Sequence, residues 1–432
     1  MATRRRTALV LIVGMILLWV AGGAGDSSAA GKIGGTVSVL GTWGGSELDS
    51  FRAMVKPFED RTGARIEFQG TRDLSAVLQT RVQGGNPPDV AALPNPGALP
   101  SLARSHALKP LGRVLDMTQL AREYPATWLD IGRVGGEPYA IVVKTALKGL
   151  VWYDPKTLSA EHVTLPATWA GMLATTDRLA GRGTSAWCLG LASGATSGWP
   201  ATDWIDMLLL RAAGPAAHDA WVQHKTAWDA APVRQAWEQF GRIAANPKYV
   251  YGGPQAVLAT DFGEAPFPMF AKPPRCLFHL QATFIEDIIQ KQFSWVRPGA
   301  DLAFVPMPPI APRYAGVAQI AGDVFGMFHD TPQARALMRY LVSAEAQAIW
   351  VKRGGALSPN RGVPFDAYPD VLSRRAADLL VHAPAARFGA GDMMPPEMTA
   401  AFYKGTLDYV AHTDQLRAIL RHLEAVARDA YK

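Results

Sequence analysis

The sequence predicts an α/β protein with two interleaved lobes, and three observations point to this fold class. The chain has 432 residues, more than the ~100–200 residues of one typical domain, and 49% of them are apolar. Short β-rich runs alternate with segments in which apolar residues recur every three or four positions. The sequence contains neither an internal repeat nor a low-complexity linker that would separate independent domains. We therefore expect each lobe to hold a mainly parallel sheet flanked by helices.

The elements of the amino-terminal block alternate regularly. Strands are expected at 33–40, 66–68 and 90–93, where short apolar runs are bounded by turn-forming residues. Helical periodicity over 48–58 and 74–82 places a helix after each of the first two strands. This order is typical of a parallel sheet covered by helices.

The loops that follow these three strands are expected to share one crevice, because ligands of parallel sheets bind outside the carboxyl ends of the strands. These loops, at 41–47, 70–73 and 94–97, contain Trp43, Glu47, Arg72, Asp73 and Asn95. Glycines on both sides of Trp43 favour an exposed indole over a core tryptophan. Glu47 is either a ligand contact or a favourable charge at a helix start, and Asp73 is either a contact or a helix cap.

A second block begins near Lys144 and repeats the alternation of strand and helix. A strand at 150–153 leads into a turn, and helical spacing recurs around 169–173, 205–209 and 237–243. The remaining predicted elements are a strand at 317–328, helices at 332–341 and 344–350, and a helical tail at 400–431.

The first thirty residues have the layout of an export signal. Arg4, Arg5 and Arg6 precede an apolar run from 8 to 24, and small residues follow up to Ala30. We expect cleavage near Ala30, with an uncleaved membrane anchor as the alternative. The apolar run is not followed by a cysteine for lipid attachment. These features predict a soluble periplasmic protein.

Charge and cysteine content exclude several classes of protein. The formal net charge is +6 and is spread along the chain without a Lys/Arg block, so nucleic acid is a poor candidate partner. The two cysteines, Cys188 and Cys276, are expected to form one disulfide in an oxidising compartment; two buried thiols are the alternative. Two cysteines without paired histidines do not predict a metal site, and we expect no cofactor.

Four stretches, in consistent order, resemble the extracellular solute-binding proteins (family 1) of carbohydrate ABC transporters, and within them the α-glucoside-binding branch. They are GGNPPDV (84–90), GLVWYD (149–154), CLGL with the following SGWP (188–200), and KRGGALSPN (352–360). The resemblance extends from about residue 36 to the carboxyl terminus.

The resemblance implies a periplasmic-binding-protein (Venus-flytrap) fold whose two lobes close on a sugar. Lobe 1 would hold residues 31–144 and 318–358, and lobe 2 residues 145–317 and 359–432. The implied function is high-affinity binding of a small α-glucoside, such as a di- or oligosaccharide or glucosylglycerol, and its delivery to the permease subunits of an ABC importer. The protein would act as a monomer.

A sugar site needs flat aromatic rings for the C–H faces of the sugar and planar polar groups for its hydroxyls. Candidates in the second block and at the crossings between lobes are Lys144, Trp199, Asp203, Trp204, Asp323 and Arg361. For both tryptophans the alternative is packing in the core. For Asp323 the alternative is an ion pair with an arginine, and for Arg361 it is a position in a solvated loop. Phe402 and Tyr403 match a region where relatives place a stacking aromatic, although a helical core is the commoner place for such residues.

Signatures of common enzyme classes are absent from the sequence, including the Gly-x-Ser-x-Gly elbow, His-Glu-x-x-His and phosphate-binding loops. The alternative function is a secreted glycoside hydrolase, which would need two carboxylates beside the scissile bond. The sequence offers two candidate carboxylate pairs, Asp73 with Asp203 and Glu47 with Asp323. A binder of a non-sugar polar solute on the same scaffold is a further alternative.

Overall fold

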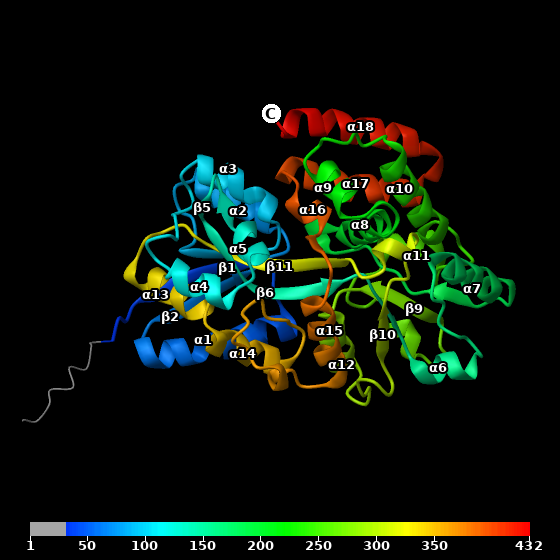
Figure 1. Cartoon of the computed structure of the whole chain (residues 1–432), viewed down its shortest axis with the longest axis horizontal. Helices are drawn as coiled ribbons and strands as arrows, with labels where there is room; N and C mark the ends of the chain where they lie inside the picture. The colour runs from blue at the N-terminus through cyan, green and yellow to red at the C-terminus, as the bar shows by residue number, and fades with distance from the viewer. Residues whose placement is uncertain (1–31) are drawn as a thin grey trace, which may run out of the picture. The chain divides into compact units, whose positions relative to one another are not determined.

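The structure is a computed structural model that describes residues 32–432. The predicted export signal and its cleavage site lie outside these residues. Two β-sheets organise the described part of the chain into two lobes, and helices cover both sheets (Figure 1). No helix between residues 32 and 432 has the length and apolar content that crossing a bilayer requires.

The first lobe is built on a six-stranded sheet. Its strands run in the order β12 (Ala386–Phe388), β11 (Ala318–Met327), β3 (Val90–Leu93), β1 (Thr36–Gly41) and β2 (Arg65–Gly70), and β6 (Ala140–Lys148) pairs with the other side of β11. β1 lies parallel to both β2 and β3, as the alternation of strands and helices predicts. The loops that follow these three strands therefore emerge at the same edge of the sheet.

The second lobe is built on a four-stranded sheet. Its strands are β10 (Ala303–Pro306), β7 (Leu150–Tyr153), β9 (Cys276–Gln281) and β8 (Ser185–Trp187), in that order. Two of its pairings are antiparallel and only β8 with β9 is parallel, so this sheet is mixed instead of mainly parallel. The reason is the central position of β7, which runs opposite to both of its neighbours.

Helices surround each sheet. In the first lobe and at its margin they are α1 (Gly45–Thr62), α2 (Leu74–Gln83), α3 (Leu99–Arg104), α4 (Met117–Glu123), α5 (Ala126–Ile131), α13 (Pro332–Leu341) and α14 (Ala344–Arg353). The others are α6 (Pro155–Ala160), α7 (Trp169–Gly181), α8 (Trp199–Ala213), α9 (Pro215–Val222), α10 (Ala231–Ala244), α11 (Gly253–Ala259), α12 (Ile285–Gln292), α15 (Val371–Val381), α16 (Ala390–Met393), α17 (Pro396–Ala411) and α18 (Leu416–Ala430). Apolar side chains gather in two cores. The larger core surrounds the first sheet and also covers one face of the second sheet, and the smaller core covers the other face of the second sheet.

The long strands β6 and β11 carry the chain between the two lobes. They pair antiparallel, and Lys144 lies opposite Asp323 next to a β-bulge. All nine residues of β6 are buried. The chain then turns into β7 at Gly149, which has a φ of +68°, a conformation that favours glycine. The crossing is therefore a buried element whose turn depends on a glycine.

The predicted disulfide between Cys188 and Cys276 is confirmed. Their Cα atoms lie 5.5 Å apart, and both residues are buried beside the second sheet. The bond joins the segment after β8 to the first residue of β9, so it fixes two parallel strands to each other.

A buried polar network connects helices α8 and α9 to the crossing strand β11. Asp206 on α8 accepts hydrogen bonds from Gln319 Nε2 on β11 (2.7 Å) and from the backbone amide of Ala390 (2.9 Å). His218 Nε2 on α9 lies 2.9 Å from the other oxygen of Asp206. Burial by itself would lower the pKa of His218, but Asp206 and Asp219 together raise it to about 9.

The network predicts a loss of stability at alkaline pH. The folded protein binds the proton of His218 more tightly than the unfolded chain does, so protonated His218 stabilises the fold. This contribution to the unfolding free energy is complete below the unfolded pKa of 6.5 and is lost as the pH rises through about 9. We expect this loss to be on the order of 3 kcal/mol of unfolding free energy. Urea denaturation between pH 6 and pH 9.5 measures it. A His218→Gln variant should show a flatter pH profile, and an equally steep profile in that variant would contradict the assignment.

Candidate ligand-binding site

A cavity of about 140 Å³ lies between the lobes, at the carboxyl ends of the first sheet's parallel strands. Seven of the predicted site residues line it: Trp43, Glu47, Arg72, Asn95, Lys144, Trp199 and Asp323. They come from the loops after β1, β2 and β3, from the crossing strands β6 and β11, and from the start of α8. The structure therefore brings together residues that lie up to 280 positions apart in the sequence.

Lys144 forms the first charged centre of the cavity. Its Nζ contacts the carboxylate of Glu47 and lies 3.7 Å from Asp323 Oδ2. Burial would lower the pKa of Lys144, but the two carboxylates raise it above its usual value, so the ammonium remains charged. The indole rings of Trp43 and Trp350 lie 5.6 and 5.0 Å from Nζ and add cation–π attraction.

Lys148 forms a second centre of the same kind. Its Nζ donates hydrogen bonds to Asp203 Oδ1 (2.7 Å) and to Asp392 Oδ2 (2.9 Å). The pKa of Lys148 is raised, because the two carboxylates outweigh the effect of burial. Burial raises the pKa of Asp203 and of Asp392, and the charge of a neighbouring carboxylate adds to the effect. Two buried carboxylates thus share one cation.

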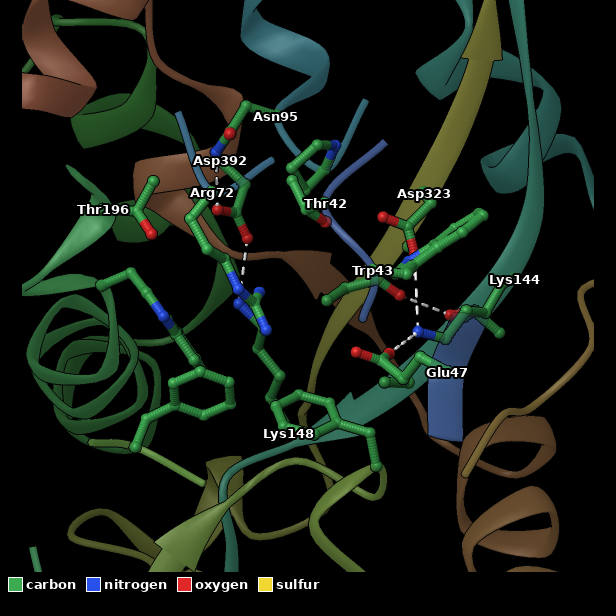
Figure 2. A pocket seen from close by; sticks show the side chains of 18 of the residues that line it. Thr42, Trp43, Glu47, Arg72, Asn95, Lys144, Lys148, Thr196, Asp323 and Asp392 are labelled. Carbon is green, nitrogen blue, oxygen red and sulfur yellow. Dashed lines mark hydrogen bonds and ion pairs between the residues drawn. The ribbon is translucent and has the colours of Figure 1, made fainter. Parts of the chain in front are cut away.

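The spacing of the two lysines defines the length of the site. Four residues of extended strand separate them, so both side chains project from the same face of β6, roughly 13 Å apart along the strand. Figure 2 shows Lys144 joined to Glu47 and Asp323 on one side, and Lys148 joined to Asp392 on the other. The cavity therefore offers hydrogen-bonding groups at two separate ends.

An aromatic wall lies on the second lobe's side of the cavity, made of Trp199, Phe262 and Phe284. The Trp199 ring packs edge-on against Phe262 at 5.1 Å and lies 6.1 Å from Phe284. Trp199 is partly exposed, because it begins α8 and is not enclosed in the core. The wall presents apolar aromatic surface to the cavity.

The expectation that flanking glycines leave Trp43 exposed is wrong. Trp43 is only 3% exposed, because its ring stacks on Phe68 at 5.8 Å and meets Trp350 edge-on at 5.0 Å. The indole lines the cavity from within an aromatic cluster, so it can contact both Lys144 and a ligand.

Four predicted site residues lie outside the lining of the cavity. Asp203 lies behind it as a partner of Lys148. Trp204 is 1% exposed and packs edge-on against Trp187 in the second core, since it occupies a different face of α8 from Trp199. Asp73 is exposed at the N-cap position of α2, where its side chain accepts no capping hydrogen bond from residues that the structure describes. Arg361 is exposed, and its backbone amide donates to Glu123.

The prediction also missed residues that line the cavity, namely Lys148, Asp392, Phe262 and Phe284. Lys148 had a local signal, because it is a second lysine four positions after Lys144 in an apolar strand. The other three lie in segments without any such pattern. Of the two late aromatic residues that were considered, Tyr403 lines the cavity and Phe402 is fully buried in the core.

The charges of the side chains that line the cavity balance. Among the described residues that line it, the cations are Lys144, Lys148 and Arg72, and the anions are Glu47, Asp323 and Asp392. A site of this composition suits a neutral polar ligand better than an anion or a cation, because each ionic ligand would leave a charge uncompensated. No cluster of candidate metal ligands occurs between residues 32 and 432.

Comparisons with known proteins agree with this geometry. Residues 53–371 match the family described as bacterial extracellular solute-binding protein. The osmoprotective compounds-binding protein GgtB of Synechocystis is 35% identical over 405 residues, which cover 94% of this chain and 95% of that protein. The alpha-glucosides-binding periplasmic protein AglE of Rhizobium meliloti is 33% identical, with 87% and 84% covered.

Solved structures show the same fold. A chitin oligosaccharide binding protein has a TM-score of 0.79 at 18% identity, covering 92% of this chain and 98% of its own. Maltose-bound MalE3 of T. maritima has a TM-score of 0.71 at 16% identity, covering 91% and 100%. At these identities the likeness shows the two-lobed fold alone.

The Lys148 centre predicts a pH-dependent defect on substitution. Lys148→Met should lower the unfolding free energy by about 3–5 kcal/mol at pH 7, because Asp203 and Asp392 would stay buried without a cation. The defect should shrink toward pH 5, since burial raises the pKa of both carboxyl groups and protonation removes their charge. Urea denaturation at both pH values measures it. Lys56→Met, at a lysine whose side chain is 63% exposed, is the control; a Lys148 variant as stable as this control would contradict the assignment.

Proposed function

This chain belongs to the bacterial extracellular solute-binding protein family, and from that premise we propose that it binds a small neutral sugar of the α-glucoside class and delivers it to the permease of an ABC importer. The observation that carries the proposal is the charge-balanced cavity, with a lysine–carboxylate centre at each end and an aromatic wall alongside. The names of GgtB and AglE, which refer to osmoprotective compounds and α-glucosides, support the choice of ligand class.

The chemistry of a sugar matches this arrangement. Each hydroxyl both donates and accepts a hydrogen bond, so it can donate to Glu47 or Asp392 and accept from Lys144 or Lys148. The C–H faces of a pyranose ring are apolar and suit the partly exposed ring of Trp199. A neutral sugar leaves the balanced charges of the cavity undisturbed.

The same geometry favours binding over hydrolysis. A glycosidase needs one protonated carboxyl and one carboxylate on opposite sides of the scissile bond. Glu47 and Asp323 both contact Lys144, so the two carboxylates are directed at one cation. Of the other predicted pair, Asp73 lies on the surface and Asp203 behind Lys148.

We also propose the cellular location, the lobe boundaries and the oligomeric state of the protein. The layout of residues 1–30 supports export to the periplasm with cleavage near Ala30. The two sheets support a division into residues 31–144 with 318–358 and residues 145–317 with 359–432, except that β12 and the end of β6 pair in the first sheet. In this proposal the protein works as a monomer and needs no cofactor.

Binding without turnover is the first test. Calorimetric titration with glucosylglycerol, trehalose, sucrose and maltose should detect binding of at least one of them, with the sugar recovered unchanged by chromatography after long incubation. Arabinose-5-phosphate and glucosamine serve as anionic and cationic controls, and we expect neither to bind, because the charges of the cavity balance. Accumulation of a hydrolysed product beyond one equivalent of protein would overturn the assignment as a binder.

The aromatic wall supplies the second test. Trp199→Ala should weaken binding of the cognate sugar by about thirtyfold, since a stacking aromatic anchor contributes on the order of 2 kcal/mol. Trp295→Ala, at an indole that is 51% exposed and does not line the cavity, is the matched control and should bind normally. Unchanged affinity in a folded Trp199 variant would show that the wall does not contact the ligand.

A further inference from the structure

Asp203 is a buried residue that does not line the cavity but is joined to a residue that does. Its Oδ1 accepts a hydrogen bond of 2.7 Å from Lys148 Nζ. Its other oxygen, Oδ2, is buried and has no hydrogen-bond partner among the residues that the structure describes. Lys148 lines the cavity together with Asp392, which accepts a second hydrogen bond from the same Nζ at 2.9 Å. The direct route from Asp203 to a ligand therefore runs through Lys148.

The two carboxyl groups that share Lys148 differ in how well their oxygens are satisfied. Asp392 accepts from Asn95 Nδ2 at Oδ1 (3.0 Å) and from Lys148 at Oδ2 (Figure 2). Asp203 accepts a hydrogen bond at one oxygen alone. A buried carboxylate oxygen without a donor is costly, and protonation reduces this cost because it removes the charge. A proton shared by the pair is therefore better placed on Asp203 than on Asp392.

The charges around Asp203 also favour a bound proton. The titratable groups that face it are Lys148 on β6, Asp392 on α16, Asp206 on the same helix and Tyr403 on α17. Asp206 is already satisfied by the buried network described above, and burial keeps Tyr403 neutral by raising its pKa. One ammonium thus faces two carboxyl groups. Burial raises the pKa of Asp203 to about 7, although Lys148 opposes the shift.

A ligand would change this balance without touching Asp203. Because Oδ2 is already buried, filling the cavity does not alter its solvation. A sugar hydroxyl that donates to Asp392 would take over part of the compensation of that carboxylate, so more of the attraction of Lys148 would remain for Asp203. We propose that Asp203 is a positioning residue that holds Lys148 and that it releases a proton when the sugar binds. The inference rests on the proposed function and adds a dependence of affinity on pH.

Proton release can be measured directly, by calorimetric titration in buffers that differ in their heat of ionisation. The probe is whichever of glucosylglycerol, trehalose, sucrose and maltose binds most tightly to the purified protein at pH 7. We expect release of a fraction of one proton. Affinity should also rise about three- to tenfold from pH 5.5 to pH 8.5, because a ligand that lowers the pKa of a group by one unit binds its ionised form tenfold more tightly.

The wild-type protein by itself can contradict this inference. Binding without proton exchange, or with proton uptake, would overturn it and leave the sugar-binding function intact. Binding of none of the four sugars would overturn the proposed function and the inference together.

Two substitutions of Asp203 separate the positioning of Lys148 from the release of the proton. Asp203→Asn keeps an oxygen that accepts from Lys148 but has no proton to release. At pH 5.5 it should bind the sugar within about threefold of the wild-type affinity, with no rise toward pH 8.5 and no proton release. Asp203→Ala removes the acceptor and should bind at least about tenfold more weakly than the asparagine variant at pH 5.5.

Asp60→Asn is the matched control, because Asp60 is also paired with a lysine but its side chain is 61% exposed. This variant should keep the wild-type pH profile. His218 is present in all of these proteins, so its titration does not account for a difference between their profiles. A wild-type profile in Asp203→Asn would overturn the assignment of the proton to Asp203. Equal affinity of the alanine and asparagine variants would overturn its role in holding Lys148.

Discussion

The burial of two lysines on one strand is the constraint on which the site depends. Transfer of an ammonium group from water into the protein interior costs several kcal/mol unless carboxylates surround it. The carboxylates come from four separate elements: Glu47 from α1, Asp203 from α8, Asp323 from β11 and Asp392 from α16. Because β6 carries both lysines, satisfying their charges also brings the elements of the two lobes to the two ends of one cavity.

This arrangement prepares the cavity for a neutral ligand. The carboxylate oxygens are oriented by their lysines and keep further lone pairs for hydroxyl groups, so little ordering remains to be done when a sugar binds. The aromatic wall supplies the apolar face. Charge balance would then select against ionic solutes.

Much of this could be predicted from the sequence. The alternation of strands and helices, the three loops at one sheet edge and the pairing of Cys188 with Cys276 all follow from local patterns, and the structure has each of them. The loop residues could be predicted because the topology is parallel. Since β1, β2 and β3 are parallel, their carboxyl ends lie together, so Glu47, Arg72 and Asn95 reach the cavity.

The sequence by itself thus determined the order of the elements and the edge of the sheet where the site lies. Only the tertiary structure decided which side chains face the cavity. Trp199 and Trp204 lie five positions apart on α8, about 140° around the helix, so at most one can face the site. Nearly every residue of α8 is buried, and a helix without a polar face carries no signal of which side meets the core. Asp392, Phe262 and Phe284 reach the cavity from segments that only packing between the lobes brings together.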